Sequence, residues 1–574
     1  MGAEIHVNDI KIKVSKTKSL GQFAGLPTAF KSPDKNLDRQ TIHNKLEGLK
    51  RFEPRLLSEA GNILTQLNRF SLKPDKRLEL VKTIVSQVYA IMAKRYHKYQ
   101  SQVMSLPESK EQREVLLACI TITEQAAIAY KQFFKEIYTP KSMTYRRNRQ
   151  ACIEISVRIL ELLRVEQRFR ALRHQKLPPA TWQDVNRVFF SMLVHKDVDE
   201  PVKLLGNIGT WVKASKTGMP TLPSTTARSI YVSIMLFGLI DAPSWSTRLF
   251  HIPDAYLQHI PNAMVLHSDN NKDLQPGWLI THIDNKAPPV FQREAHMAEP
   301  RMLMEYANLY NRLVVDYEEL AKMNFLGQID PKKLSRPLLD LEQIERLPFL
   351  ESMLFGLRPR ERKQKRHAAF GQNTLKLYFG YRETYNLLMD LADEKFKRIT
   401  KTRAFSDALA TSSSALVDEL ADYKNTNWEI VNFSTGGILV LTRETSFTNP
   451  IQIGQIVAFN PNKDVKRPLL GYVSRISRPN DQQIEVAIVR FSNHAEAAII
   501  QDEQQQGSNK GEAVIIFKSM EGRWCLIATH DYNFISGTPF RLLRENNQSV
   551  PARLGNVMLT KQEFIVFDLS APGM

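Results

Sequence analysis

Two short stretches of this chain combine residue types that can grip a nucleotide. The first runs from Arg358 to Arg366, where six of the nine residues are basic. Within it, Arg362 and Arg366 stand four residues apart, just before a predicted strand. The planar fork of an arginine matches the O6/N7 edge of guanine or two phosphate oxygens, and it also stacks on purines. Arg362 and Arg366 are therefore candidate ligand-binding residues.

The second stretch is NWEIVNFSTGGILVL, which the β-branched and aromatic content predicts to be a strand. Asn432 and Ser434 are two positions apart in it, so their side chains share one face of the strand. One amide and one hydroxyl then meet polar ligand atoms together. Gly436 and Gly437 follow without side chains, which permits a sharp bend and a close approach to the backbone.

In this order, and each beside a predicted strand, the two motifs resemble the signature of the PilZ family, RxxxR followed by D/N-x-S-x-x-G. The runs IGQIVAF, GYVSRIS and IEVAIVRFS behind them resemble the same family, and the likeness covers about residues 358–495. The resemblance implies a six-stranded antiparallel β-barrel that binds cyclic di-GMP. It also implies that the arginine pair grips guanine and phosphate, while the strand of Asn432, Ser434 and Gly437 forms the floor.

Three details of the motif region depart from the simplest pattern. Arg358 and Arg362 form a second RxxxR, although Pro359 lies inside it, and we prefer Arg362 with Arg366 because they lie nearer the strand. A helical insertion, about residues 382–423, separates the two motifs; loop-closure entropy grows slowly with length, so the barrel tolerates it. Arg475, on a later strand, is a candidate for a further phosphate contact.

The elements that must position these residues predict an α+β multidomain protein. Residues 1–40 lack periodicity and are expected to be an extended tail, and residues 41–345 show the apolar spacing of an all-helical region. Residues 346–500 are expected to form the PilZ-type barrel with its insertion. Residues 512–574 carry further β-rich runs and are expected to be a C-terminal extension.

Composition narrows the class of protein. The formal net charge of +18 favours anionic partners without choosing among them. We find no P-loop, GxGxxG, GxSxG, GGDEF or EAL pattern and no metal-ligand spacing, so we expect neither an enzyme nor a metal site nor a cofactor beyond the ligand. The three cysteines are far apart, and the longest apolar run is too short to span a bilayer, so we expect a cytoplasmic protein with no integral membrane segment.

The sequence therefore predicts a cyclic di-GMP receptor that couples this second messenger to a partner protein, bound through the helical region. Motility, pilus or biofilm outputs follow only by analogy with the family. Two alternatives stay open. A nucleic-acid-binding protein, which the positive charge suggests, would bind with a steep salt dependence, although we do not expect nucleic acid as a partner. A degenerate barrel would be a protein-interaction scaffold without nucleotide affinity, and the complete motif argues against this alternative.

Overall fold

The computed structural model forms two compact units, which are described separately. The first comprises residues 1–104, 108–342 and 349–360, and the second comprises residues 105–107, 343–348 and 361–574. The residues that the structure describes are 4–7, 10–13, 22–28, 30–31, 38–102, 106–138, 142–203, 224–268, 278–291, 301–326, 331–359, 367–368, 374–397, 427–443, 450–459, 467–501, 512–530, 537–561 and 563–571.

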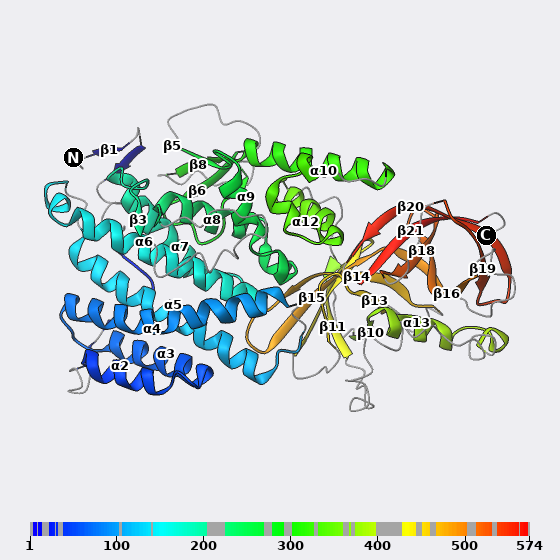
Figure 1. Ribbon diagram of the computed structural model, residues 1–574, viewed down its shortest axis with the longest axis horizontal. Coiled ribbons are helices and arrows are strands. Elements are labelled where there is room, and N and C mark those ends of the chain that lie inside the picture. Colours follow the sequence, from blue (N-terminus) through cyan, green and yellow to red (C-terminus); the bar gives the residue numbers. More distant parts are fainter. Residues whose placement is uncertain are drawn as a thin grey trace. The chain divides into compact units, whose positions relative to one another are not determined.

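Helices dominate the chain before residue 360 (Figure 1). Among the described residues, none of the helices is long and apolar enough to cross a membrane. The α-helices are α2 (Arg39–Gly48), α3 (Glu53–Arg69), α4 (Pro74–Ser101), α5 (Lys110–Ile137), α6 (Ser142–Leu172), α7 (Pro179–Val194), α8 (Ala227–Leu239), α9 (Ile252–His259), α10 (Ala307–Leu326), α11 (Arg336–Leu339) and α12 (Gln343–Gly356). Short 3₁₀ turns lie at η3 (Ala242–Ser244), η4 (Thr247–Leu249) and η6 (Pro331–Lys333).

Local sequence explains where these helices begin and which face they bury. Pro74 starts α4, as its fixed φ favours the first helical turn. Ser109 caps α5 by accepting a hydrogen bond from the Gln112 backbone N–H at 3.2 Å. Of the i, i+3, i+4 run that predicted α4, Ile91 is half-buried and the others are buried: Val81, Ile84, Val85, Val88 and Met92. The amphipathic pattern therefore predicted the core of this unit.

The prediction of an all-helical region was wrong in one part. A four-stranded antiparallel sheet has the order β5 (Val265–Ser268), β8 (Arg301–Glu305), β6 (Leu279–His282) and β7 (Val290–Phe291). Its strands are two to five residues long, and neighbouring residues of β8 are buried together, so alternation does not reveal β8. Two small ribbons pair β1 (Glu4–Val7) with β2 (Ile10–Lys13) and β3 (Val202–Lys203) with β4 (Ser224–Thr225).

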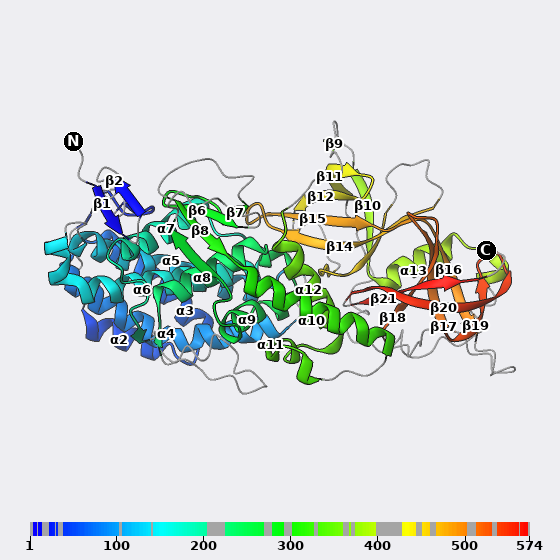
Figure 2. The ribbon, with the colours of Figure 1, turned by 90° about the horizontal axis from the view of Figure 1, so that it is seen from above.

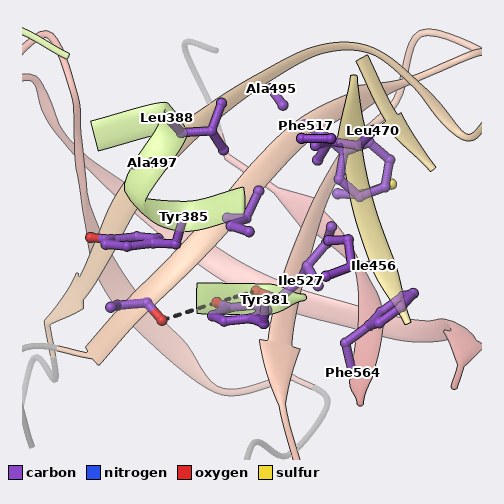
Figure 3. Packing of buried hydrophobic residues seen from close by; sticks show 14 of the residues in the cluster. Tyr381, Tyr385, Leu388, Ile456, Leu470, Ala495, Ala497, Phe517, Ile527 and Phe564 are labelled. Atoms are coloured by element: carbon purple, nitrogen blue, oxygen red, sulfur yellow. Dashed lines mark hydrogen bonds between the residues drawn. The ribbon is translucent and has the colours of Figure 1, made fainter. Parts of the chain in front are cut away.

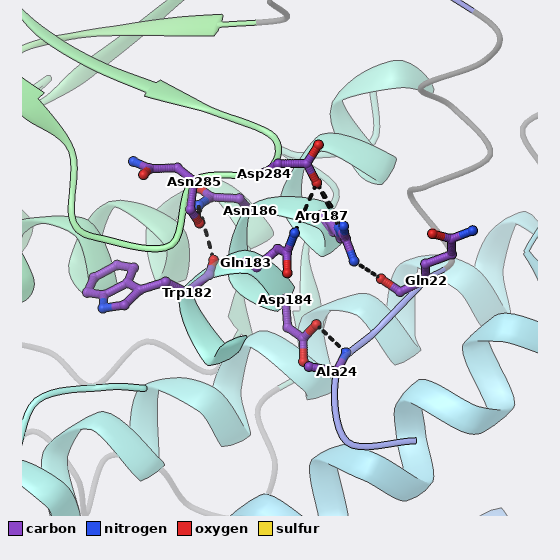
Figure 4. A network of polar contacts seen from close by, with 9 residues as sticks. All are labelled: Gln22, Ala24, Trp182, Gln183, Asp184, Asn186, Arg187, Asp284 and Asn285. Carbon is purple, nitrogen blue, oxygen red and sulfur yellow. Dashed lines mark hydrogen bonds and ion pairs between the residues drawn. The ribbon is translucent and has the colours of Figure 1, made fainter. Parts of the chain in front are cut away.

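Part of the expected N-terminal tail is packed against the helices (Figure 4). The backbone N–H of Ala24 donates to Asp184 Oδ1 at 3.0 Å, and its carbonyl accepts from Lys131 Nζ at 3.2 Å. Lys131 and Asp184 are themselves a buried ion pair at 2.7 Å. Phe23 lies beside them, edge-on to Phe134 with ring centroids 5.7 Å apart. This buried aromatic anchor gives residues 22–28 a fixed place that their composition did not predict.

His195 gives the helical unit an expected pH dependence. Its ring stacks on Tyr145 with centroids 3.5 Å apart, and burial lowers the pKa of His195 to about 4. In the unfolded chain the pKa is near 6.5, so between these values only the unfolded chain binds the proton. The free energy of unfolding should therefore fall as the pH drops from about 6.5 to about 4. Urea titrations across this window should show a weaker fall in His195→Phe than in the wild-type chain.

The first barrel of the second unit is a closed, antiparallel, six-stranded sheet (Figure 1). The strand order is β10-β13-β14-β15-β12-β11, and β11 closes the barrel by pairing with β10. A short seventh strand, β9, is added to β11. The strands are β9 (His367–Ala368), β10 (Thr374–Phe379), β11 (Asn427–Ser434), β12 (Gly437–Arg443), β13 (Ile456–Phe459), β14 (Leu469–Ser477) and β15 (Gln483–Arg490).

Alternate residues of these strands fill the barrel interior. Trp428 is 1% exposed and meets Phe379 edge-on with centroids 5.6 Å apart. Val440, Ile484 and Val486 are also fully buried in this core. Leu106, from the segment between α4 and α5, belongs to this unit as well, since it exchanges two backbone hydrogen bonds with Ile451.

A second closed barrel of six antiparallel strands occupies the C-terminal residues. The range expected for the first barrel, residues 346–500, differs from the structure at both ends, because α12 occupies its start and β16 pairs only within the second barrel. In the sequence, β16 resembles one more strand of the first barrel, because a sequence does not show with which strands it pairs. The barrel order is β16 (Ser492–Gln501), β17 (Glu512–Ser519), β18 (Trp524–Thr529), β21 (Phe564–Ser570), β20 (Ser549–Thr560) and β19 (Pro539–Arg544).

The insertion between β10 and β11 begins with α13 (Tyr381–Asp390), and residues 398–423 of its expected range lie outside the described part. Figure 3 shows α13 packed among strands of both barrels. Tyr385 and Leu388 meet Ile456 and Leu470 of the first barrel and Phe517 of the second in one buried cluster. This apolar contact joins the outer surfaces of the two barrels.

Candidate functional site

The hairpin of β11 and β12 carries the second motif. Ser434 and Gly437 close a two-residue turn, and Ser434 Oγ lies 3.4 Å from the Gly437 carbonyl oxygen as its hydrogen-bond donor. The Gly436 carbonyl accepts from the Arg490 backbone N–H at 3.0 Å, which ties the turn to β15. The run expected as one strand from Trp428 to Leu441 is therefore two strands that fold back on one another.

A β-bulge decides which way the motif faces. Ile430 pairs with the inward-facing Val440, whereas Asn432 pairs with Leu439, so Val431 is an extra residue in β11. Strict alternation from Trp428 and Ile430 would turn Asn432 and Ser434 into the core. The bulge reverses the alternation, and both side chains lie on the outer face of the barrel. Their shared face, predicted from the i, i+2 spacing, is thus an accessible one.

The outer face continues from this hairpin across β15 to β14, which lie side by side in Figure 2. The strand register sets two rows of residues across it. One row contains Asn432, Leu439, Ala487 and Arg475 in adjacent strands. The second row contains Ser434, Gly437, Val489 and Tyr472. We call these eight residues the outer face. With strands about 4.8 Å apart, each row spans roughly 14 Å.

Gly437 is required by a close backbone approach. A Cβ atom on Gly437 would lie 2.3 Å from the Ile488 carbonyl oxygen in β15, far inside van der Waals contact. The absence of a side chain therefore lets β12 sit in the sheet while the face above it stays shallow. This is the role that the glycine pair suggested in the sequence.

Gly437→Ala should consequently lower the free energy of unfolding by about 1–3 kcal/mol, as overpacking does. It should also weaken binding of the expected ligand, cyclic di-GMP, because β12 must move away from β15 to make room for the added Cβ. Thermal unfolding and ligand titration measure the two effects. The matched control is Gly48→Ala in α2, where an added Cβ meets nothing within 4 Å. An unchanged melting temperature for Gly437→Ala would contradict the assigned contact.

Of the three candidate arginines in the first motif, Arg358 alone lies among the described residues. Arg362 and Arg366 lie outside the described residues. Arg358, the first arginine of the alternative motif, belongs to the helical unit. Its Nε donates to Tyr310 Oη at 2.8 Å, and its guanidinium lies 5.7 Å from the centroid of the Tyr310 ring. The residue that follows Arg366 in sequence is His367 of β9, and it pairs with Phe433 between the two polar residues of β11.

Arg475 is the charged residue among the eight of the outer face, and Glu485 and Arg490 lie near them in β15. Arg475 follows a bulge in β14 that sets it opposite Ala487, and Glu485 accepts a hydrogen bond from Ser477 Oγ at 3.0 Å. Burial lowers the pKa of Arg490, whose Nε donates to the Ser492 carbonyl at 3.0 Å, although an arginine stays charged at neutral pH. Within the described residues, no group of three or more His, Cys, Asp or Glu side chains could hold a metal ion.

Two aspects of this site were not visible in the sequence. The bulge at Val431 breaks no composition rule, so only the pairing reveals the outward direction of Asn432. Lys561, from the second barrel, lies over the Tyr472 ring with its Nζ 4.9 Å from the centroid. A contact between residues about ninety positions apart leaves no signal in the local sequence.

Comparison with known proteins bears on the helical unit. The family model described as the N-terminal domain of the cyclic-di-GMP receptor FimW matches residues 54–270. The match runs from the start of α3 to just beyond β5, so it covers most of the helical unit and none of the strands of the two barrels. No curated protein and no solved structure matches the chain. The helical unit is therefore similar to a domain found in a second-messenger receptor.

Proposed function

We propose that this protein is a cyclic di-GMP receptor whose ligand lies on the outer face of a PilZ-type first barrel. The arrangement of β9, β11 and β12 carries the proposal. The bulge turns Asn432 and Ser434 outward, and β9 joins their strand directly after Arg366. The likeness of residues 54–270 to a domain of a cyclic-di-GMP receptor supports the same ligand independently.

In this proposal the side chains have distinct roles. Arg362 and Arg366 grip guanine and phosphate from the segment that enters β9. Asn432 and Ser434 present an amide and a hydroxyl to polar ligand atoms, and Gly437 keeps the floor shallow. None of these roles requires bond making, so the protein acts by binding and not by catalysis.

The boundary between the two compact units falls between Arg360 and Glu361, inside the basic segment. A ligand that holds this segment against the barrel would favour some arrangements of the units over others and so carry the signal to a partner. Small-angle scattering with and without saturating ligand tests this coupling. An identical profile in both states would count against it. Motility, pilus or biofilm outputs remain the outputs we propose by family analogy.

Calorimetric titration of the purified full chain with cyclic di-GMP tests the receptor proposal. We expect micromolar or tighter binding, with at least tenfold weaker binding of GMP and cyclic di-AMP, since arginine forks read the guanine O6/N7 edge. A folded protein that binds none of these nucleotides would overturn the proposal and favour a protein-interaction scaffold. Binding that instead follows salt steeply and ignores the base would favour a nucleic-acid-binding protein.

A further inference from the structure

Arg475 shares the row that begins with Asn432, at the opposite edge of the outer face. It reaches that face through a bulge of its own. Val473 is buried in the barrel core and pairs with Ile488, whereas Arg475 pairs with Ala487, so Ser474 is an extra residue in β14. Without it, Arg475 would follow Val473 into the core. Two bulges in separate strands thus turn a polar residue outward into one row, as bulges near binding sites do.

Small and apolar residues separate these two polar ends. Leu439 and Ala487 stand between Asn432 and Arg475, and Gly437 and Val489 stand between Ser434 and Tyr472. Val489 is 37% exposed, which is high for a valine in a barrel strand. The row from Asn432 to Arg475 spans roughly 14 Å, and a nucleotide fits between these two residues. A floor of this kind offers apolar contact to a ring and polar contact at each end.

The second row ends at a cation from the second barrel. Lys561 Nζ lies 4.9 Å from the centroid of the Tyr472 ring, a distance at which an ammonium group is attracted to the ring face. Two backbone contacts fix Lys561 in the turn after β20. Its N–H donates to the Phe564 carbonyl at 2.9 Å, and its own carbonyl accepts from His530 Nε2 at 2.6 Å.

The buried cluster between the barrels sets the limit of the open surface. Ile456, Ala458 and Leu470 are covered there by α13 and the second barrel, and Tyr472 packs at the edge of the cluster. Beyond Tyr472 the outer face is half-buried or exposed. Lys561 therefore stands where the covered surface of the first barrel gives way to its accessible surface.

We propose that the ligand site extends across β11, β12, β15 and β14 and ends at a second cationic pole, formed by Arg475 of the first barrel and Lys561 of the second. This rests on the proposed function. The pole takes the phosphate or guanine edge of the cyclic dinucleotide that faces away from Arg362 and Arg366. Both barrels then contribute residues to one ligand site. The second barrel contacts the ligand through Lys561 in addition to packing against the first barrel.

Calorimetric titration of the full chain with cyclic di-GMP in Arg475→Ala and Lys561→Ala tests the second pole. We expect about tenfold weaker binding for Arg475→Ala and a loss of about threefold or more for Lys561→Ala, since charge-assisted contacts are lost. Both losses should shrink as salt is raised, and Lys561→Arg should restore binding. The matched controls are Arg443→Ala, exposed at the far end of β12, and Lys518→Ala, exposed on β17.

The binding results distinguish the second cationic pole from the receptor function on which it rests. If the wild-type chain binds and Arg366→Ala does not, but both pole variants bind within twofold of wild type, the second pole is overturned and the receptor function stands. If Lys561→Ala lowers only the melting temperature, its contact with Tyr472 is a structural link between barrels, which also overturns its role in recognition. If the wild-type chain binds no cyclic di-GMP, both proposals fall.

Discussion

Arg362→Ala and Arg366→Ala are each expected to weaken cyclic di-GMP binding by roughly 10- to 100-fold, because a bidentate arginine–guanine contact contributes about 1–3 kcal/mol. Arg358→Ala should bind nearly as wild type does, since its guanidinium already contacts Tyr310 in the helical unit. Calorimetric titration of the three variants at one salt concentration measures these differences.

The pattern of losses also decides between the two RxxxR registers. Arg443→Ala serves as the control, since it removes an exposed arginine from the same barrel at the end of β12 away from the hairpin. A loss in Arg358→Ala and Arg362→Ala with full binding by Arg366→Ala would assign the motif to the earlier pair. Full binding by all three variants would remove the basic segment from the site.

Glu563→Ala is expected to lower the free energy of unfolding of the paired barrels by about 2–3 kcal/mol. The Glu563 carboxylate precedes β21 and accepts from the backbone N–H of Tyr381 at 2.8 Å and of Ile456 at 2.9 Å. It therefore caps α13 and ties the second barrel to β13 of the first. Hydrogen bonds to a charged group contribute about 1.5–3 kcal/mol, and alanine leaves both buried donors without an acceptor.

The measurement is urea unfolding followed by tryptophan fluorescence, with Glu521→Ala as the control in an exposed turn of the same barrel. Glu563 also gives a pH effect of known sign. Burial raises the pKa of Glu563, although its two backbone hydrogen bonds lower it. Between the unfolded and the folded pKa the folded chain therefore holds a proton that the unfolded chain releases, and above the folded pKa the side chain is the charged carboxylate. Stability should fall as the pH rises from about 4.3 through the folded pKa, and Glu563→Gln should remove this fall. An unchanged urea midpoint in Glu563→Ala would refute the role of Glu563 in joining the barrels.

Strong local patterns predicted most of the individual elements. The amphipathic run of α4 and its start at Pro74 were readable because apolar side chains recur every three to four residues. The strands β10 and β15 alternate buried and accessible residues, whereas β14 begins with three buried residues in succession. The runs GYVSRIS and IEVAIVRFS agree with β14 and β15 to within two residues. The hairpin turn after Ser434 falls on the glycine pair that suggested a bend.

What escaped prediction depends on pairing between distant segments. The extra residues at Val431 and Ser474 look like ordinary strand residues, and only their partners in β12 and β15 show that they are bulges. The assignment of β16 to a second barrel rests in the same way on its bonds to β17 and β19. Phe23 packs on Phe134 over a hundred residues away, so its segment looked like a tail.

The connection between the barrels determines how the protein can be divided for experiments. Only Phe491 separates β15 from β16, and Phe491 packs against Phe517 with ring centroids 4.9 Å apart. A recombinant fragment ending at residue 500 would keep almost all of the ten-residue β16 but lose β17 and β19, exposing both edges of an apolar strand. Unpaired strand edges of this kind template aggregation. A soluble binding fragment should therefore extend through β21, and insolubility of shorter versions would carry no information about the ligand.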